Sequence, residues 1–281
     1  MTAQTVMMSG LPGKMATLVA ETILKRGGKD IEISTMALTG SDQPPHQTIA
    51  GTVFSLMSPL NHEAALHSAP SLTRGPVIVI DFTQPDAVNR NAELYCEYKI
   101  PFVMGTTGGD RKALEQRVID SGNVAVIAPN MAKPIVLIQA MVEYAAKTFP
   151  GALEGFQLFI TESHQSSKKD TSGTAKAMVS YFNMLSIPIN VEDIVMIRDP
   201  KTQRAILGVP EKHLAGHGYH SYNLTSSDGT VRLAFKHDVD GRQIYADGTI
   251  DAIKFLSGKI KQGSRGEVYS MIDVLKGETS A

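Results

Sequence analysis

The sequence predicts an α/β protein in which a doubly wound, Rossmann-like nucleotide-binding domain is joined to an α+β substrate domain with a mixed sheet. Short apolar runs alternate with helical patterns along roughly the first 130 residues. Each of these apolar runs ends in a small polar turn. After Asn130, β-like stretches follow one another with few helices between them, which is typical of a mixed or antiparallel sheet.

The composition is that of a globular protein with one large domain or two modest ones. The chain has 281 residues, of which 42% are hydrophobic and 20% charged. A net charge of −1 gives no general reason to bind nucleic acid, and no apolar run approaches the ~18–20 residues of a membrane span. The single cysteine, Cys96, excludes an intramolecular disulfide and a cysteine metal cluster. No signal peptide is visible, so we expect a cytoplasmic protein, or a plastid stromal one if the source is a plant or alga.

The first element is a strand over residues 5–9, followed by a glycine-rich turn and a helix that ends near Gly27. Gly10 and Gly13 lie in the turn, and Lys14 and Met15 begin the helix. Glycines at such a turn let the backbone approach a dinucleotide pyrophosphate, whose charge lies at the helix N-terminus. Because the pattern has two glycines instead of three, it also fits an ordinary strand–helix turn.

The second strand, over residues 31–38, ends where this fold binds the adenosine ribose. Thr39 and Ser41 offer hydroxyls for a 2′-phosphate, and Asp42 offers a carboxylate for a ribose. Neither an acidic residue nor an arginine stands directly at the strand end. The cofactor therefore stays open between NADPH and NADH, with NADPH slightly favoured. A loop is expected over residues 44–46 and a short strand over residues 52–57.

Three further strands are apolar throughout, as buried parallel strands are; they are expected over residues 76–80, 101–104 and 124–128. The carboxyl ends of parallel strands meet along one crevice, so the turns that follow them are candidates for cofactor binding. These candidates are Asp81, Phe82, Thr83, Gly105, Thr107, Pro129 and Asn130. Phe82 and Thr83 are expected to border a nicotinamide, whereas Asp81 also fits a structural role.

The pattern changes from residue 131. We expect helices over residues 131–149, 173–185 and 247–261, and a tail that returns to the first domain. Strands are expected over residues 156–161, 193–197, 219–225 and 231–235. The predicted nucleotide-binding domain covers residues 1–131 and 251–281, and the predicted substrate-binding and oligomerisation domain covers residues 132–250.

Residues 162–175 predict an anion site. They join a strand to a helix through a polar segment that contains His164 and Lys168, and Ser172 fits the N-cap of the helix. Free N–H groups and the positive end of the helix dipole would meet cationic side chains there, which suits a carboxylate or a phosphate. The alternative is a solvated basic loop with an ordinary cap.

Several motifs occur together in one order along nearly the whole chain. They are Gly10-x-x-Gly13-Lys14-Met15, Asp81-Phe82-Thr83, Gly105-Thr106-Thr107-Gly108, Glu162-x-His164-x-x-x-Lys168, Ser172-Gly173-Thr174-Ala175, Gly241-Arg242, Tyr245-Ala246-x-Gly248 and Met271-x-Asp273-Val274-Leu275. Together they resemble the dihydrodipicolinate reductase family, and more closely its plant-type branch. Gln165 stands where many bacterial members have a second histidine, and Ala16 stands where a third glycine is usual.

The resemblance implies an NAD(P)H-dependent oxidoreductase of lysine and diaminopimelate biosynthesis. It would reduce dihydrodipicolinate, or its hydrated form 4-hydroxy-tetrahydrodipicolinate, to tetrahydrodipicolinate. The implied partners are NADPH or NADH, a small cyclic dicarboxylate and further copies of the chain in a homotetramer built through the sheet of the substrate domain. No metal, nucleic acid or membrane is implied.

Within this chemistry Lys168 is the best candidate for the proton donor, and His164 would orient the ring or assist proton transfer. Ser172, Gly173 and Thr174 would bind one carboxylate, and Gln165 would add a hydrogen bond. Two alternatives stay open: another two-domain NAD(P)-dependent amino-acid dehydrogenase, and a non-catalytic NAD(P)H-binding redox sensor. The remaining candidates fit structural roles at least as well; they are Lys169, Arg242, His213, His217, His220 and His237.

Overall fold

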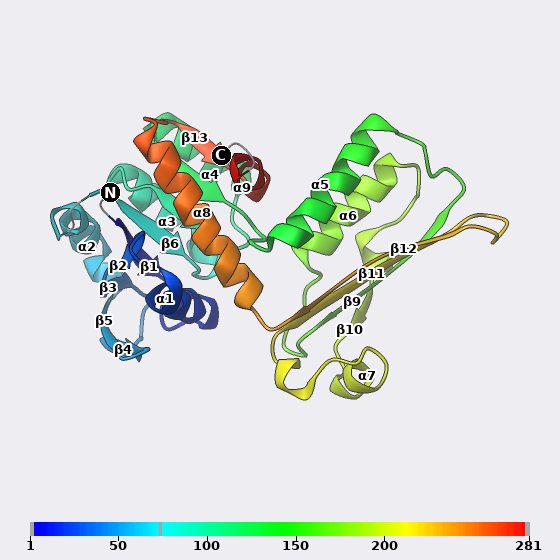
Figure 1. The fold of residues 1–281 in the computed structure, drawn as a ribbon, viewed down its shortest axis with the longest axis horizontal. Coiled ribbons are helices and arrows are strands. Elements are labelled where there is room, and N and C mark those ends of the chain that lie inside the picture. Colours follow the sequence, from blue (N-terminus) through cyan, green and yellow to red (C-terminus); the bar gives the residue numbers. More distant parts are fainter. Residues whose placement is uncertain (1–2, 73–74, 279–281) are drawn as a thin grey trace. The chain divides into compact units, whose positions relative to one another are not determined.

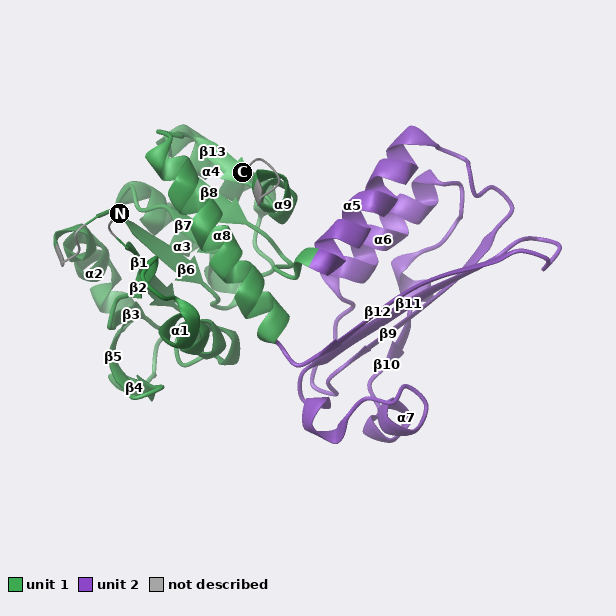
Figure 2. Ribbon diagram, viewed as in Figure 1, with its two compact units in different colours: residues 1–133, 243–281 green, residues 134–242 purple. Residues whose placement is uncertain are grey.

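The computed structural model describes residues 3–72 and 75–278, and Figure 1 shows its helices and strands. The chain forms two compact units, which Figure 2 shows in different colours. Unit 1 contains residues 1–133 and 243–281, and unit 2 contains residues 134–242. No helix among the described residues is both long and apolar enough to cross a membrane.

Unit 1 is built on a sheet in which nine strands of the described chain take part. The strands are β1 (Gln4–Ser9), β2 (Ile31–Ile33), β3 (Met36–Leu38), β4 (His46–Ile49), β5 (Thr52–Met57), β6 (Val77–Asp81), β7 (Phe102–Met104), β8 (Val124–Ile127) and β13 (Glu267–Tyr269). Their order is β13-β8-β7-β6-β1-β3-β5-β4, with β2 also beside β1, and every neighbouring pair is parallel except β4–β5. The predicted doubly wound sheet is thus confirmed, and β13 from the tail pairs with β8 at its edge.

Helices cover both faces of this sheet because its central strands are buried on both sides. They are α1 (Lys14–Arg26), α2 (His62–Ser68), α3 (Val88–Glu97), α4 (Arg111–Ser121), α8 (Gln243–Lys261) and α9 (Met271–Glu278), with 3₁₀ turns at Pro59–Asn61, Ala69–Leu72 and Pro85–Ala87. Helices α2, α3 and α4 pack on one face, where Met7, Val79 and Phe102 meet Tyr95 and the buried Cys96. Helices α1 and α8 pack against each other, and α8 also contacts β7 and β8.

Two details of unit 1 differ from the prediction. The single strand expected over residues 31–38 is interrupted, because the Ser34 hydroxyl accepts the N–H of Met36 and takes it from the ladder. The prediction placed His46 in a loop beside two prolines, whereas β4 pairs antiparallel with β5. The hairpin turn consists of Ala50 and Gly51, both at positive φ (47° and 83°), which matches the twist of the paired strands.

Unit 2 contains a mixed four-stranded sheet in the order β10-β9-β11-β12, as predicted for a substrate domain of α+β type. Strands β9 (Gln157–His164) and β10 (Val195–Ile197) are parallel, and β11 (His217–Thr225) runs antiparallel to β9 and to β12 (Arg232–Asp240). Helices α5 (Lys133–Thr148) and α6 (Gly173–Met184) supply the core residues Val142, Met178 and Phe182 that meet Ile160 and Tyr222 of the sheet.

Strand β9 and the chain after β10 are where unit 2 departs from expectation. Strand β9 continues through His164, three residues beyond the predicted end, so that only residues 165–171 form the loop before α6. A short helix that was not predicted, α7 (Pro200–Ala205), follows β10 and is capped by the Asp199 side chain. Two 3₁₀ turns, Val191–Asp193 and Glu211–His213, complete the unit.

Gly248 allows α8 to lie directly against the backbone before α5. A Cβ at Gly248 would be 1.7 Å from the carbonyl oxygen of Met131, whereas a Cβ at Gly258 on the same helix would meet no atom within 4 Å. Alanine ordinarily stabilises a helix relative to glycine. The two glycines of α8 therefore predict opposite effects of the same substitution.

We expect Gly248→Ala to lower the free energy of unfolding by roughly 1–3 kcal/mol, because α8 must move away from Met131. Gly258→Ala is the matched control and should raise it by about 0.5–1 kcal/mol. Urea unfolding followed by circular dichroism measures both changes. Equal effects of the two substitutions would show that the close approach at Met131 does not constrain α8.

Candidate active site

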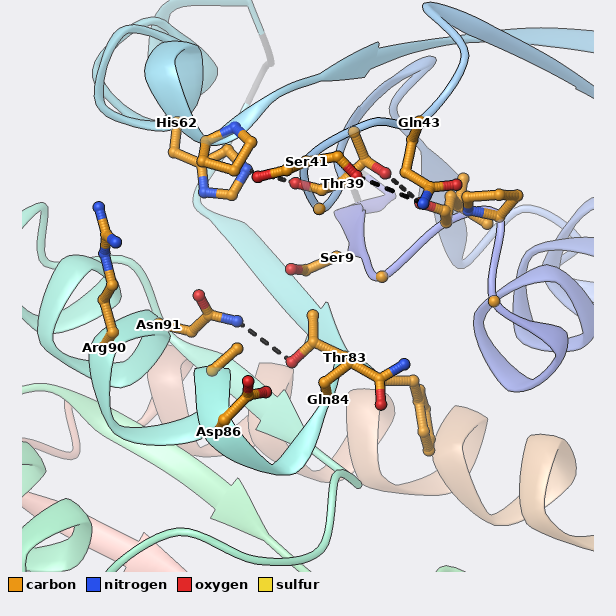
Figure 3. A pocket seen from close by; sticks show the side chains of 18 residues that line it. Ser9, Thr39, Ser41, Gln43, His62, Thr83, Gln84, Asp86, Arg90 and Asn91 are labelled. Atoms are coloured by element: carbon orange, nitrogen blue, oxygen red, sulfur yellow. Dashed lines mark hydrogen bonds between the residues drawn. The ribbon is translucent and has the colours of Figure 1, made fainter. Parts of the chain in front are cut away.

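A cavity of about 600 Å³ lies at the carboxyl ends of the strands of unit 1 (Figure 3). It is lined by the turn after β1, the loop after β3, the turn after β6 and the start of α3. Of the predicted cofactor residues, Gly10, Gly13, Thr39, Phe82 and Thr83 line it. The others do not: Lys14, Met15, Asp81, Gly105, Thr107, Pro129 and Asn130.

The glycine-rich turn after β1 is shaped by its close contact with the turn after β6. Gly10 has φ +109°, and a Cβ there would be 2.3 Å from the carbonyl oxygen of Phe82. The N–H of Gly13 donates to the Gly10 carbonyl at 2.8 Å, and Gly13 is the N-cap of α1 without any side-chain cap. The first N–H groups of α1 thus face the cavity side of the turn with no capping side chain, as an anion site requires.

Two predicted cofactor residues do not line the cavity but contact residues that do. A Cβ on Gly105 would be 2.2 Å from the Phe82 ring, so Gly105 makes room for that ring. Asp81 is fully buried, and its two carboxylate oxygens accept from five donor atoms at 2.7–3.1 Å. The donors belong to Thr83 (N–H and hydroxyl), Asn91, Tyr95 and Thr106. Burial beside Asp81 raises the pKa of Tyr95 well above its ordinary value, so this phenol stays a donor.

The loop after β3 forms the opposite wall of the cavity. The Thr39 hydroxyl is buried and donates to the Leu11 carbonyl at 2.5 Å, which occupies its hydrogen. Ser41 lines the cavity and is exposed. Sequence reasoning missed His62 and Arg90, whose side chains both extend along the cavity in Figure 3. His62 Nε2–H donates to the carbonyls of Thr39 and Met57, and burial lowers its pKa.

The second group of predicted residues lies in unit 2 at the end of β9. Ser172 caps α6 as predicted, since its hydroxyl accepts the N–H of Ala175 at 3.0 Å. Its own N–H donates to the Glu162 carboxylate at 3.0 Å. The N–H of Gly173 is used by no hydrogen bond within residues 3–72 and 75–278, and a Cβ there would meet no atom within 4 Å. The N-terminus of α6 therefore has an unused N–H group and free space beside it at Gly173.

Lys168 lies in the loop before this helix. Its N–H closes a turn on the Gln165 carbonyl at 2.9 Å, and its ammonium group pairs with Asp170 at 2.7 Å. The Lys168 side chain is 22% exposed and that of Asp170 73%. The hydrogen bond from Lys168 lowers the pKa of Asp170. Lys169 is exposed. Lys168 is thus a half-buried cation whose partner is a solvated carboxylate.

The hydrogen bonds of His164 determine where its proton lies. Its Nδ1 is 3.1 Å from the His217 carbonyl, which can only accept, so Nδ1 carries the hydrogen. Its Nε2, 3.1 Å from His220 Nε2, must then accept from His220 in the neutral state. His220 Nδ1, in turn, accepts from the Tyr222 hydroxyl at 3.3 Å. Tyr222, His220 and His164 form one directed chain of donors that ends on a backbone carbonyl.

Burial keeps this chain uncharged. It lowers the pKa of His164 to about 4, an effect that the neighbouring Glu162 carboxylate opposes. Burial, and then the nearby His237 and His164, lowers the pKa of His220 well below its ordinary value. His164 is therefore a neutral imidazole near pH 7 and carries no spare proton for a substrate.

Glu162, His164 and His220 place one possible metal-ligating atom each within 4.8 Å of one another. The carboxylate of Glu162, however, is already bound by Arg198 and by the Ser172 N–H. The closeness of these three side chains is thus explained by their hydrogen bonds and the ion pair with Arg198, without a metal ion. Arg198 was not singled out from the sequence, because it lies 36 residues after Glu162 and outside any recognisable motif.

The chain of buried histidines predicts acid-sensitive stability. In the unfolded chain a histidine binds a proton near pH 6.5, whereas native His164 does so only near pH 4. The unfolded state thus binds more protons over this range, so stability should fall as pH is lowered from about 6.5 to 4 and be level above it. His217, His220 and His237 are shifted in the same direction, also by burial.

We expect His220→Gln to flatten this pH dependence by up to ~1.4 kcal/mol per pH unit, the slope due to one proton. Urea unfolding of wild type and variant at a series of pH values between 4.5 and 7.5 measures the two slopes. Parallel slopes would contradict the neutral, buried assignment of His220.

The chain is similar to known proteins over nearly its whole length. A family model described as dihydrodipicolinate reductase, N-terminus, matches residues 4–131, and one described as dihydrodipicolinate reductase, C-terminus, matches residues 134–275. A probable 4-hydroxy-tetrahydrodipicolinate reductase 1, chloroplastic, of Oryza sativa subsp. japonica is 44% identical over 273 residues, covering 96% of this chain and 78% of the relative. The chloroplastic 4-hydroxy-tetrahydrodipicolinate reductase 1 of Arabidopsis thaliana is also 44% identical, over 96% of this chain and 77% of the relative.

A similar solved structure is the dipicolinate-bound dihydrodipicolinate reductase from Paenisporosarcina sp. TG-14. It superposes with a TM-score of 0.64 at 19% identity and covers 96% of this chain and 98% of that one. At this identity the likeness supports the fold.

Proposed function

Because the chain belongs to the dihydrodipicolinate reductase family, we propose that it reduces 4-hydroxy-tetrahydrodipicolinate to tetrahydrodipicolinate with NADPH or NADH. This is a step of lysine and diaminopimelate biosynthesis. Two structural observations carry the proposal. The N-terminus of α6 has open space at Gly173, and Lys168, paired with the solvated Asp170, lies in the loop just before it, which suits a small dicarboxylate. The chloroplastic names of the plant relatives favour the plastid stroma over a bacterial cytoplasm as the location.

Unit 1 is the proposed nucleotide-binding domain, and the cavity residues fit a dinucleotide. The uncapped N-terminus of α1 and the tight Gly10 turn would hold the pyrophosphate. Thr83, positioned by Asp81, would lie beside the nicotinamide. When bound, the reduced nicotinamide supplies the hydride. The other predicted cofactor residues do not line the cavity, and we propose that they contribute to cofactor binding indirectly.

Unit 2 is the proposed substrate domain. One substrate carboxylate would accept the N–H groups of Gly173 and Thr174 and the hydroxyl of Ser172, and Gln165 would add a donor. Hydride addition to a conjugated imine leaves electron density on the ring, and a proton must follow. Lys168 would give that proton and regain it from solvent, because the single N–H of neutral His164 is bonded to the His217 carbonyl. His164 would serve to orient the ring.

The oligomeric state is a further part of the proposal. The sheet of unit 2 leaves large apolar side chains at the surface, among them Phe159 at 55%, Val195 at 42% and Leu233 at 40% exposure. A homotetramer built through this sheet would cover them. Analytical ultracentrifugation should give the mass of four chains, and a monomer at micromolar concentration would contradict this part.

The reaction is tested by following nicotinamide absorbance with purified protein. We expect absorbance to fall when the cyclic dicarboxylate is supplied with NADPH or NADH. Oxidation of an amino acid without turnover of the cyclic substrate would favour an amino-acid dehydrogenase. Nucleotide binding with no turnover of either would favour a redox sensor.

Lys168→Ala should lower turnover by roughly 10²–10⁴-fold, the range typical of a lost general acid. Lys169→Ala is the matched control, because this neighbouring lysine is exposed, and it should retain activity. Steady-state kinetics of both variants measures the difference. Near-normal turnover in Lys168→Ala would assign the proton to another donor.

A further inference from the structure

Glu162 is a carboxylate with no access to solvent at the end of β9. One oxygen accepts the N–H of Ser172, the N-cap of α6, at 3.0 Å, and the other is paired with Arg198. Glu162 therefore connects the end of β9 to the N-cap residue of α6. The N-terminus of this helix is the proposed carboxylate site. A buried carboxylate persists only while its donors stay in place.

Arg198 reaches the same region from the neighbouring strand. Strand β10 is parallel to β9 with Ile197 opposite Ser163, so the next residue, Arg198, lies beside the start of the loop. Its side chain is 17% exposed, and besides the Glu162 carboxylate it donates to backbone carbonyls along the loop. The acceptors are the carbonyls of Lys168 at 2.7 Å and of Glu162, Asp170 and Ile197 at 3.3 Å.

The planar guanidinium group thus holds both ends of the loop and the residue at its centre. Its Nε–H donates to the carbonyl of Lys168 itself, which fixes the backbone that carries the proposed acid. A lysine in the same place would keep one positive charge but could not satisfy acceptors in several directions of one plane. This geometry distinguishes a positioning role from simple neutralisation of Glu162.

We propose that Arg198 and Glu162 are positioning residues that set the distance between the Lys168 ammonium group and the N-terminus of α6, and so the fit of a dicarboxylate ring. Both side chains are bonded to protein atoms, so they would act through Lys168 and α6. The inference rests on the proposed function, because it concerns the same dicarboxylate site. A displacement of about 1 Å at such a site is enough to cost roughly 100-fold in rate.

The test compares Arg198→Lys with Arg204→Lys. Arg204 is the matched control, because it lies on α7 in the same unit and its partner pair with Glu211 is exposed (44% and 73%). Calorimetric binding of dipicolinate and steady-state kinetics with the cyclic substrate are measured for both. We expect Arg198→Lys to weaken dipicolinate binding and lower kcat/KM by roughly 10- to 100-fold. The KM for the nicotinamide cofactor should stay within about twofold of wild type, and Arg204→Lys should match wild type throughout.

Two further variants separate positioning from folding. Glu162→Gln keeps the shape of the side chain and should show the same selective loss. Arg198→Ala should regain part of its activity when guanidinium ion is added at millimolar concentration, because the free ion can occupy the same fork of acceptors. If Arg198 served stability alone, guanidinium ion would restore activity only by raising the melting temperature of Arg198→Ala. Rescue of activity at an unchanged melting temperature therefore supports the positioning role.

The outcomes are separable. Wild-type dipicolinate binding and activity in Arg198→Lys would overturn the positioning role while leaving the proposed function standing. Failure of both Arg198→Lys and Glu162→Gln to fold would also overturn it, since the pair would then serve stability alone. A wild-type protein that neither binds dipicolinate nor turns over the cyclic substrate would instead contradict the proposed function.

Discussion

A buried carboxylate needs donors on every side, and this chain uses that requirement once in each unit to fix its candidate site. In unit 1, Asp81 accepts from Thr83, Asn91, Tyr95 and Thr106, which brings the turns after β6 and β7 together with α3. In unit 2, Glu162 accepts from the N-cap of α6 and from Arg198. The hydrogen bonds to these two carboxylates restrict the backbone of the turns and the helix N-terminus that form the candidate sites.

The proposed chemistry of unit 2 is divided between neutral histidines and a lysine. His164 and His220 are buried, share hydrogen bonds in one direction and stay neutral. Lys168 forms an ion pair with the solvated Asp170. In the proposed mechanism, proton delivery and ring orientation fall to different residues.

The parallel strands and the helices between them were predictable because buried parallel strands are continuous apolar runs that end in polar turns. The hairpin of β4 was missed, because Pro44 and Pro45 favour a loop and the turn at Ala50 gives no strong signal. The extension of β9 through His164 was missed because its last residues are polar, and their partners come from β10 and β11. The alternation of Ile160, Glu162 and His164 on one face was the available sign. Arg198 had none, since all its acceptors except the Ile197 carbonyl belong to residues 28–36 positions away in the sequence.

The central claim is that a substrate carboxylate lies at the N-terminus of α6 beside Lys168. A crystal structure of the protein with dipicolinate tests it most directly. The account predicts a carboxylate within hydrogen-bond distance of the Gly173 N–H and the Lys168 ammonium group, with Asp170 released from that lysine. Dipicolinate bound elsewhere, with Lys168 still paired to Asp170 and the N-terminus of α6 holding only water, would contradict it.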